Sequence, residues 1–141
     1  MKCFVGFSHH NTFISKLIAA KMGKGYSHTF MVFECNGEPI VLHATGKGVN
    51  AIHWNIFKLK NKIVKMVEIV DSQKITAAFS YCVSKLGNPY GFLAIVAIGL
   101  GIHYEDGEKT LICSEYVARA LSLEFQKLED LVTPADIEAS L

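Results

Sequence analysis

Short apolar runs, separated by turn residues, fill much of the first half of the chain and are typical of β-strands. The segment 2–7 is one such run, and the run 26–35 (YSHTFMVFEC) is rich in aromatic and β-branched residues. Further strands are expected over 39–44, 49–54 and 63–70. The pattern therefore predicts a sheet built from strands that lie close together in the sequence.

Apolar residues at helical spacing, with suitable start and stop residues, mark the segments around these strands. Asn11 and the pair Thr133-Pro134 are good helix starts. Gly23 and Gly87 are good helix stops. Helices are expected on this basis over 12–22, from Asp71 or Ser72 to about Leu86, from Ile112 or Cys113 to about Leu123, and over 134–140.

The order of these elements indicates the fold class. A meandering antiparallel sheet with helices before and after it is typical of an α+β fold. The chain has 141 residues, which suits one domain, and a chain of this size needs no metal or disulfide to stabilise its core. No repeat, low-complexity segment or linker interrupts it. We therefore expect a single α+β domain over residues 1–141.

The charge balance does not indicate a macromolecular partner. Half of the residues are hydrophobic, 19% are charged, and the formal net charge is +1 with neutral histidines. This balance gives no electrostatic argument for nucleic acid or for an anionic membrane surface. The basic cluster formed by Lys58, Lys60, Lys62 and Lys65 is interpreted as the solvated face of a strand.

Cysteine usage indicates a reducing environment and no metal centre. Cys3, Cys35, Cys82 and Cys113 form no CxxC pair and no Cys/His run with zinc spacing, so cytoplasmic synthesis without a cofactor is expected. The first residues lack the apolar core of a signal peptide. The longest apolar run, 92–102, is shorter than the roughly 20 residues of a transmembrane helix. It is interpreted as a buried segment, with a lipid-facing lip as the alternative.

Two histidines are expected to meet on the predicted hairpin. Asn36-Gly37 is a strong signal for a two-residue turn between strands. Counting back from this turn, His28 and His43 lie on the same face as diagonal neighbours, about 7–8 Å apart at the backbone. Two imidazoles at that separation can form a hydrogen bond.

Cys113 begins the segment CSEYVARAL at the expected start of a helix. The N–H groups and the dipole of a first helical turn stabilise a thiolate. A neighbouring histidine that acts as base, and a third polar group that orients this histidine, complete a nucleophilic site. Cys113, His28 and His43 are therefore a candidate nucleophile, base and orienting residue. The alternative is a packed core thiol with ordinary strand histidines.

The same residues resemble the NlpC-type amidases of the papain fold. The run YSHTFMVFECNGEPIVLHATGKGV is similar to their histidine strand and the strand that follows, and CSEYVARAL is similar to their nucleophile helix. LGNPYGF resembles an LG-x-PY motif upstream of the cysteine, and TPADIEASL resembles their C-terminal segment. Because the histidines precede the cysteine, the order is that of the circularly permuted branch. This branch includes YiiX-like proteins and lecithin:retinol acyltransferase-like enzymes.

The resemblance implies a permuted papain-like fold and a cysteine hydrolase that needs no cofactor or metal. Such enzymes cleave amide or thioester bonds, often in peptidoglycan peptides or lipid-linked substrates. Tyr90 of the PY motif and Ser114 beside the nucleophile are then expected to contact the substrate. The segment from Tyr90 to Cys113 is longer than in ordinary NlpC-type proteins. Residues 112–115 (ICSE) differ from the cysteine motif of the acyltransferase branch, so hydrolysis is favoured over acyl transfer.

Two alternatives to a hydrolase stay open on the sequence. One is an acyltransferase or thioesterase on a lipid-linked substrate, with residues 92–102 in contact with the acyl chain. The other is a papain-like module that binds a partner or joins a virion without catalysis, since bacterial and phage proteins both occur in this branch. The residues do not indicate the substrate, the oligomeric state, or delivery to a cell wall or virion.

Overall fold

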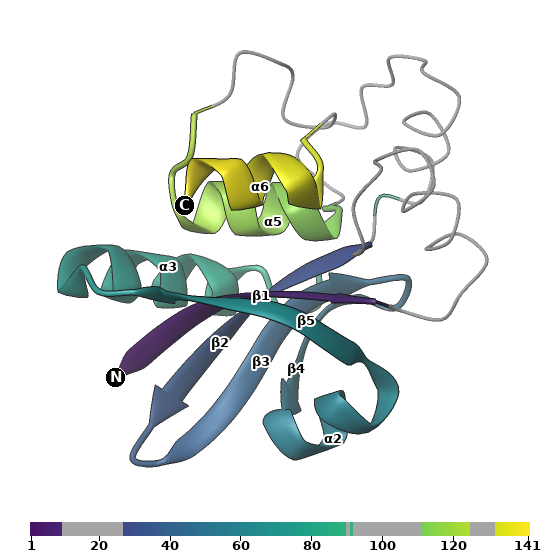
Figure 1. Ribbon diagram of the computed structural model, residues 1–141, viewed down its shortest axis with the longest axis horizontal. Coiled ribbons are helices and arrows are strands. Elements are labelled where there is room, and N and C mark those ends of the chain that lie inside the picture. The colour runs from purple at the N-terminus through teal and green to yellow at the C-terminus, as the bar shows by residue number, and fades with distance from the viewer. Residues whose placement is uncertain (10–26, 90, 92–110, 125–131) are drawn as a thin grey trace.

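The chain folds as an antiparallel sheet with helices on both faces (Figure 1). The structure is a computed structural model that describes residues 1–9, 27–89, 91, 111–124 and 132–141. The strands are β1 (Lys2–His9), β2 (His28–Cys35), β3 (Glu38–Thr45), β4 (Gly48–His53) and β5 (Lys62–Ile69). The helices are α2 (Trp54–Lys60), α3 (Ser72–Ser84), α5 (Cys113–Ala120) and α6 (Pro134–Ser140).

The five strands form one sheet in the order β4-β3-β2-β1-β5. Every neighbouring pair is antiparallel. β2, β3 and β4 follow one another as a meander, and β1 lies between β2 and β5. The predicted α+β class with an antiparallel sheet is therefore confirmed.

The turn between β2 and β3 sets the register on which the candidate site depends. Asn36 and Gly37 have positive φ values of 53° and 84°, as a two-residue type I′ turn requires. Cys35 consequently pairs with Glu38, and the pairing continues from there without a shift. The predicted hairpin is confirmed.

Helices α3, α5 and α6 cover one face of the sheet (Figure 1). The larger apolar cluster lies between these helices and the sheet. It joins Val5, Met31 and Leu42 of three neighbouring strands to Tyr116 of α5 and Ile137 of α6. Packing in this cluster fixes the position of α5 on β2 and β3.

Helix α2 covers the opposite face of the sheet (Figure 1). Its buried residue, Phe57, packs with Phe30, Val32 and Val41 in a second apolar cluster. Both faces of the sheet are therefore covered by helices that pack on it through apolar side chains, and the smaller of the two clusters lies between the sheet and α2.

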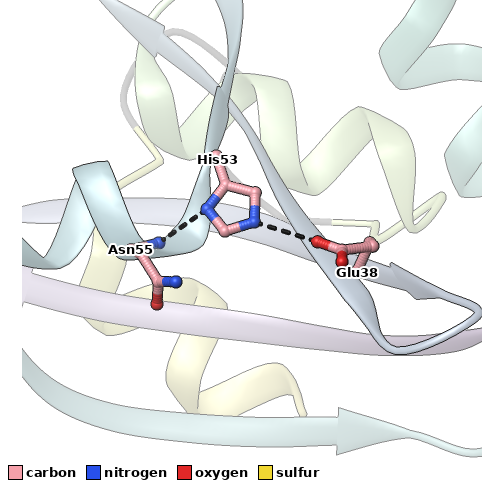
Figure 2. A network of polar contacts seen from close by, with 3 residues as sticks. All are labelled: Glu38, His53 and Asn55. Carbon is pink, nitrogen blue, oxygen red and sulfur yellow. Dashed lines mark hydrogen bonds and ion pairs between the residues drawn. The ribbon is translucent and has the colours of Figure 1, made fainter.

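The start of α2 is capped by a histidine. Nδ1 of His53 accepts a hydrogen bond from the N–H of Asn55 at 3.2 Å, and Nε2 lies 3.2 Å from Oε2 of Glu38 (Figure 2). Histidine is not among the usual capping residues, so the sequence carries no recognisable signal for this start.

The structure corrects two sequence-based expectations in this region. The strand predicted over 49–54 ends at His53, because Trp54 already belongs to α2. Lys58 and Lys60 consequently lie on a helix, and the interpretation of the basic cluster as a strand face is wrong for both.

Other helix boundaries follow from local contacts. The Asp71 carboxylate accepts hydrogen bonds from the N–H groups of Lys74 (3.1 Å) and Gln73 (2.8 Å), which lower its pKa, and the predicted cap of α3 is confirmed. α5 ends at Ala120, earlier than predicted, and Ser122 beyond it has a φ of 51°.

The predictions for 12–22 and 92–102 lie outside the described residues. Among the helices that the structure describes, none is long and apolar enough to cross a membrane.

Candidate functional site

His28 and His43 form a buried hydrogen-bonded pair. Nε2 of His28 lies 3.1 Å from Nδ1 of His43, and the two ring centroids are 5.4 Å apart in an edge-to-face arrangement. Each residue is 7% exposed. The expectation that the hairpin register brings these two imidazoles together is confirmed.

The atoms used in this bond define the roles that the two rings can take. A hydrogen bond between Nε2 of His28 and Nδ1 of His43 requires one proton between them, carried by either ring. When Nε2 of a neutral His28 carries this proton, Nδ1 of His28 is the atom that can take up another one. Protonation of His28 then leaves the bond intact, because His43 still accepts through Nδ1. The pair therefore suits a base that is held in one tautomer.

An aromatic layer contacts the pair from the side of α2. The ring centroid of Phe57 lies 5.2 Å from that of His43 and 6.4 Å from that of His28. The ring of Phe30 stacks on that of His28 with 6.0 Å between their centroids, and its centroid lies 4.5 Å from that of Phe57. These contacts restrict rotation of both imidazoles and so maintain the geometry of the pair.

Cys113 is the first residue of α5 and is also 7% exposed. α5 contacts β2 and β3, the two strands that carry the histidines. The N–H groups of a first helical turn point out of the helix and carry partial positive charge. The predicted placement of the thiol at a helix start is therefore confirmed.

Backbone hydrogen bonds connect the start of α5 to one end of the sheet. Leu111 donates to the carbonyl of Pro89 at 3.2 Å, and Val49 donates to the carbonyl of Asn88 at 2.9 Å. Val49 is the second residue of β4 and pairs with Ala44 in β3. The segment that leads into α5 is thus fixed at the end of the sheet where β3 ends and β2 begins.

The thiol and the imidazoles come from different layers of the fold. His28 lies on the same face as Phe30 and Phe57, which α2 covers, whereas the core residues of α5 pack on the other face. In Figure 1 the N-terminal end of α5 lies at the end of the sheet where β2 begins. A reaction that uses both groups therefore takes place at the end of the sheet rather than over one of its faces.

A partly buried ion pair accompanies the first turn of α5. Oε1 of Glu115 lies 2.8 Å from Nη2 of Arg119, and Oε2 accepts a hydrogen bond from the N–H of Ile112 at 3.5 Å. The carboxylate thus satisfies a backbone donor at the helix start, while the guanidinium balances its negative charge near Cys113. Sequence analysis did not predict this pair, although a Glu and an Arg four residues apart on a helix are a usable signal.

Two residues were predicted to contact substrate. The Ser114 hydroxyl donates to the carbonyl of Val132, and Ser114 is 2% exposed. This contact joins α5 to the segment before α6 and does not support a role in binding, which stays a prediction. Tyr90 lies outside the described residues.

The other cysteines provide reference thiols of two kinds. Burial raises the pKa of both Cys3 and Cys82 to about 12, and both belong to the larger apolar cluster. The expectation that Cys3 is a core residue is confirmed. Cys35 is an exposed free thiol beside the hairpin turn.

Ser8 places a buried hydroxyl without a described partner beside His28. The two residues pair across β1 and β2, Ser8 is 0% exposed, and its Oγ has no hydrogen-bond partner in the described part of the chain. Because a buried unsatisfied hydroxyl is destabilising, we expect Ser8→Ala to raise the free energy of unfolding by about 1 kcal/mol. Urea denaturation followed by circular dichroism measures this change.

Thr29 is the matched control for this prediction. It is equally buried, but its Oγ1 donates to the carbonyl of Gly6 at 3.1 Å. Thr29→Val removes that bond and is expected to lower the free energy of unfolding by about 1 kcal/mol. A loss of stability in Ser8→Ala would mean that its hydroxyl has a stabilising partner.

Comparisons with known proteins identify the fold. A scan against protein-family models gives no match, and a search of curated proteins gives none either. Among solved structures, the crystal structure of the metalloprotein YiiX from Escherichia coli O157:H7 (DUF1105) is similar, with a TM-score of 0.67 and 21% sequence identity. The match covers 85% of this chain and 63% of the length of YiiX. At this level of identity the likeness concerns the fold, and the chain therefore has a YiiX-like α+β fold.

Proposed function

We propose that the chain is a cysteine-dependent hydrolase of amide or related acyl bonds, with Cys113 as nucleophile, His28 as base and His43 as the orienting residue. The observation that carries the proposal is the buried 3.1 Å hydrogen bond between the imidazoles. Burying polar rings against phenylalanines costs free energy that apolar residues at these positions would avoid. A buried histidine pair at the end of a sheet where a cysteine begins a helix is therefore favoured by function rather than by stability.

The order of elements supports a permuted papain-like arrangement. The two histidine strands, β2 and β3, precede the cysteine helix α5 in the chain, as in the permuted branch that the sequence resembles. A YiiX-like fold is compatible with this arrangement. The proposed substrates are peptides or other acyl compounds, with cell-wall peptides as the class implied by the resemblance.

The proposed reaction has two stages. Nδ1 of His28 takes the proton of the Cys113 thiol, and the sulfur forms a bond to the acyl carbon. The resulting oxyanion accepts a hydrogen bond from the backbone N–H of Cys113. The bond to the leaving group then breaks, and the leaving group takes the proton from His28. In the second stage, His28 removes a proton from water, and the oxygen of that water forms a bond to the acyl carbon of the thioester. The bond between this carbon and the sulfur then breaks, the acid is released, and the sulfur takes the proton from His28, which restores the thiol.

The charges around the first turn of α5 are compatible with a thiolate. The Glu115 carboxylate, two residues after the cysteine, would by itself oppose a negative charge on the sulfur. Its partner Arg119, 2.8 Å away, offsets that repulsion. The positive end of the helix dipole then acts on Cys113, and among the described residues the Glu115 carboxylate beside it is compensated by Arg119.

The proposal does not use a metal, although the similar YiiX is described as a metalloprotein. Within the described ranges no group of three or more His, Cys, Asp or Glu side chains is arranged to hold a metal ion. Nε2 of His28 and Nδ1 of His43 are directed at each other rather than at a shared ligand. These residues therefore do not fit a metal centre, and no step of the reaction is derived through one.

Alkylation of the free cysteines with iodoacetamide tests the proposal without knowledge of the substrate. We expect Cys113 to react at least about tenfold faster than Cys35 at neutral pH, because an ion pair with His28 keeps the sulfur as thiolate. Cys3 and Cys82 should stay unmodified even at mildly alkaline pH, since their pKa of about 12 keeps them protonated. Peptide mass mapping over time measures these rates in one sample.

Two histidine variants complete this test. His28→Gln removes the base and is expected to slow alkylation of Cys113 by about a hundredfold. His53→Asn changes a histidine at the other end of β4 and retains a capping side chain, so it should leave the rate unchanged. If Cys113 reacts no faster than Cys35 and His28→Gln has no effect, the chain is a non-catalytic module.

A further inference from the structure

The outer side of α2 exposes apolar side chains among lysines. Leu59 is 84% exposed and Ile56 is 49% exposed, and their spacing of three places them next to each other on the helix. Lysines flank them on the helix and directly after it. We call this set the α2 surface: Ile56, Lys58, Leu59, Lys60 and Lys62.

The charge of this region differs from that of the whole chain. Residues 39–67 include five lysines and no aspartate or glutamate, although the formal net charge of the chain is only +1. Lys65 pairs with Glu138 at 2.9 Å and so does not contribute. Lys58 lies over the ring of Trp54, 5.5 Å from its centroid. In the described part of the chain, Lys60 and Lys62 have no acidic partner, so the α2 surface carries uncompensated positive charge.

The fold holds the α2 surface in place. Phe57, on the inner side of the helix, is 1% exposed and contacts the histidine pair. His53 caps the start of the helix and is joined to Glu38 (Figure 2). α2 also lies on the opposite side of the sheet from α3, α5 and α6 (Figure 1). Leu59 and Ile56 therefore point outward from a helix that is anchored on its other side.

We infer that the α2 surface docks on an anionic lipid bilayer. Exposed leucine and isoleucine flanked by lysines, with a tryptophan at the margin, match the apolar interior and the negative headgroups of such a surface. Nucleic acid would use the lysines but would leave Leu59 and Ile56 exposed to water. The absence of acidic residues over 39–67 provides the charge complementarity. This inference is independent of the proposed hydrolase activity.

The tryptophan of the chain reports on this docking. Trp54 is the single tryptophan and begins α2. Phosphatidylcholine vesicles that contain phosphatidylglycerol should shift its emission to the blue and sediment the protein. Vesicles of phosphatidylcholine alone should do neither, and high salt should reverse binding to the anionic vesicles.

Paired variants assign the binding to the α2 surface. Leu59→Ser combined with Lys60→Gln should weaken binding to the anionic vesicles by at least about tenfold, because each lysine near such a surface is worth about fivefold and the apolar contact is lost as well. Val83→Ser combined with Lys74→Gln likewise removes one exposed aliphatic side chain and one lysine, but on α3, and should leave binding unchanged.

Several results would overturn the inference. These are equal binding of the two double variants, equal binding to neutral and anionic vesicles, or no binding to either. A dimer that depends on Leu59, detected by analytical ultracentrifugation without vesicles, would instead assign the α2 surface to a second copy of the chain. Alkylation of Cys113 is measured separately, so failure of the docking inference leaves the hydrolase proposal unaffected.

Discussion

Cys113→Ala is expected to abolish formation of an acyl-enzyme from an activated ester such as p-nitrophenyl acetate. The intact chain should release p-nitrophenol in a burst and carry an acetyl group on Cys113, because the sulfur is the proposed attacking atom. Without it, turnover should fall by at least about a thousandfold, as for other nucleophiles that act with a paired base. Absorbance of p-nitrophenol gives the rate, and peptide mass mapping locates the acetyl group.

The control for this prediction is Cys35→Ala, which removes an exposed thiol beside the hairpin turn and should leave the burst unchanged. Both variants should keep the circular dichroism spectrum of the intact chain, since each removes only one small side-chain atom. An acetyl group on a residue other than Cys113, or an unchanged burst in Cys113→Ala, would contradict the proposed mechanism.

Gly48→Ala is expected to lower the free energy of unfolding by about 2–4 kcal/mol. Gly48 has a φ of 97°, and a Cβ at this position would lie 2.6 Å from the carbonyl oxygen of Asn88. Backbone atoms cannot give way as a flexible side chain can, so the bonds of Val49 to Asn88 and Gly87, each 2.9 Å, should be strained or broken. Urea denaturation measures the loss.

Gly46→Ala is the matched control, because a Cβ at Gly46 meets nothing within 4 Å in the described structure. It lies in the same turn and should change the free energy of unfolding by less than about 1 kcal/mol. Equal effects of the two substitutions would show that the contact of Gly48 with Asn88 is not what stabilises this turn. The alkylation rate of Cys113 should fall in Gly48→Ala alone, since Asn88 belongs to the segment that is bonded to Leu111.

The histidine pair could be predicted because it depends on short-range chemistry. Asn36-Gly37 selects a two-residue turn, and the alternation of side chains along each strand then decides which residues share a face. One extra residue in the turn would have placed His28 and His43 on opposite faces, because a shift of one residue reverses the face of every side chain in the strand. The prediction that the two imidazoles meet, which the 3.1 Å contact confirms, therefore depends on the two-residue turn.

Helix α2 could not be predicted, because its start depends on an unusual cap and on a residue that is distant in sequence. Its start is capped by His53, whose ring takes a role that serine, threonine, aspartate or asparagine usually has. The cap is supported by Glu38, which is distant in sequence and adjacent only after β3 and β4 have paired. Ser114 shows the same limit, since its bond to Val132 depends on how α5 packs against the segment before α6.

The sequence by itself determined the register of the two hairpin strands, the meeting of His28 with His43, and the position of Cys113 at the start of a helix. These features follow from turn geometry, side-chain alternation and helix-start patterns, all of which act between residues close in sequence. Only the tertiary structure decided that α5 begins at the same end of the sheet as β2. Tertiary contacts also turned Leu59 and the lysines around it outward on one surface. Long-range packing and the pairing of distant segments set both outcomes, and no local pattern encodes them.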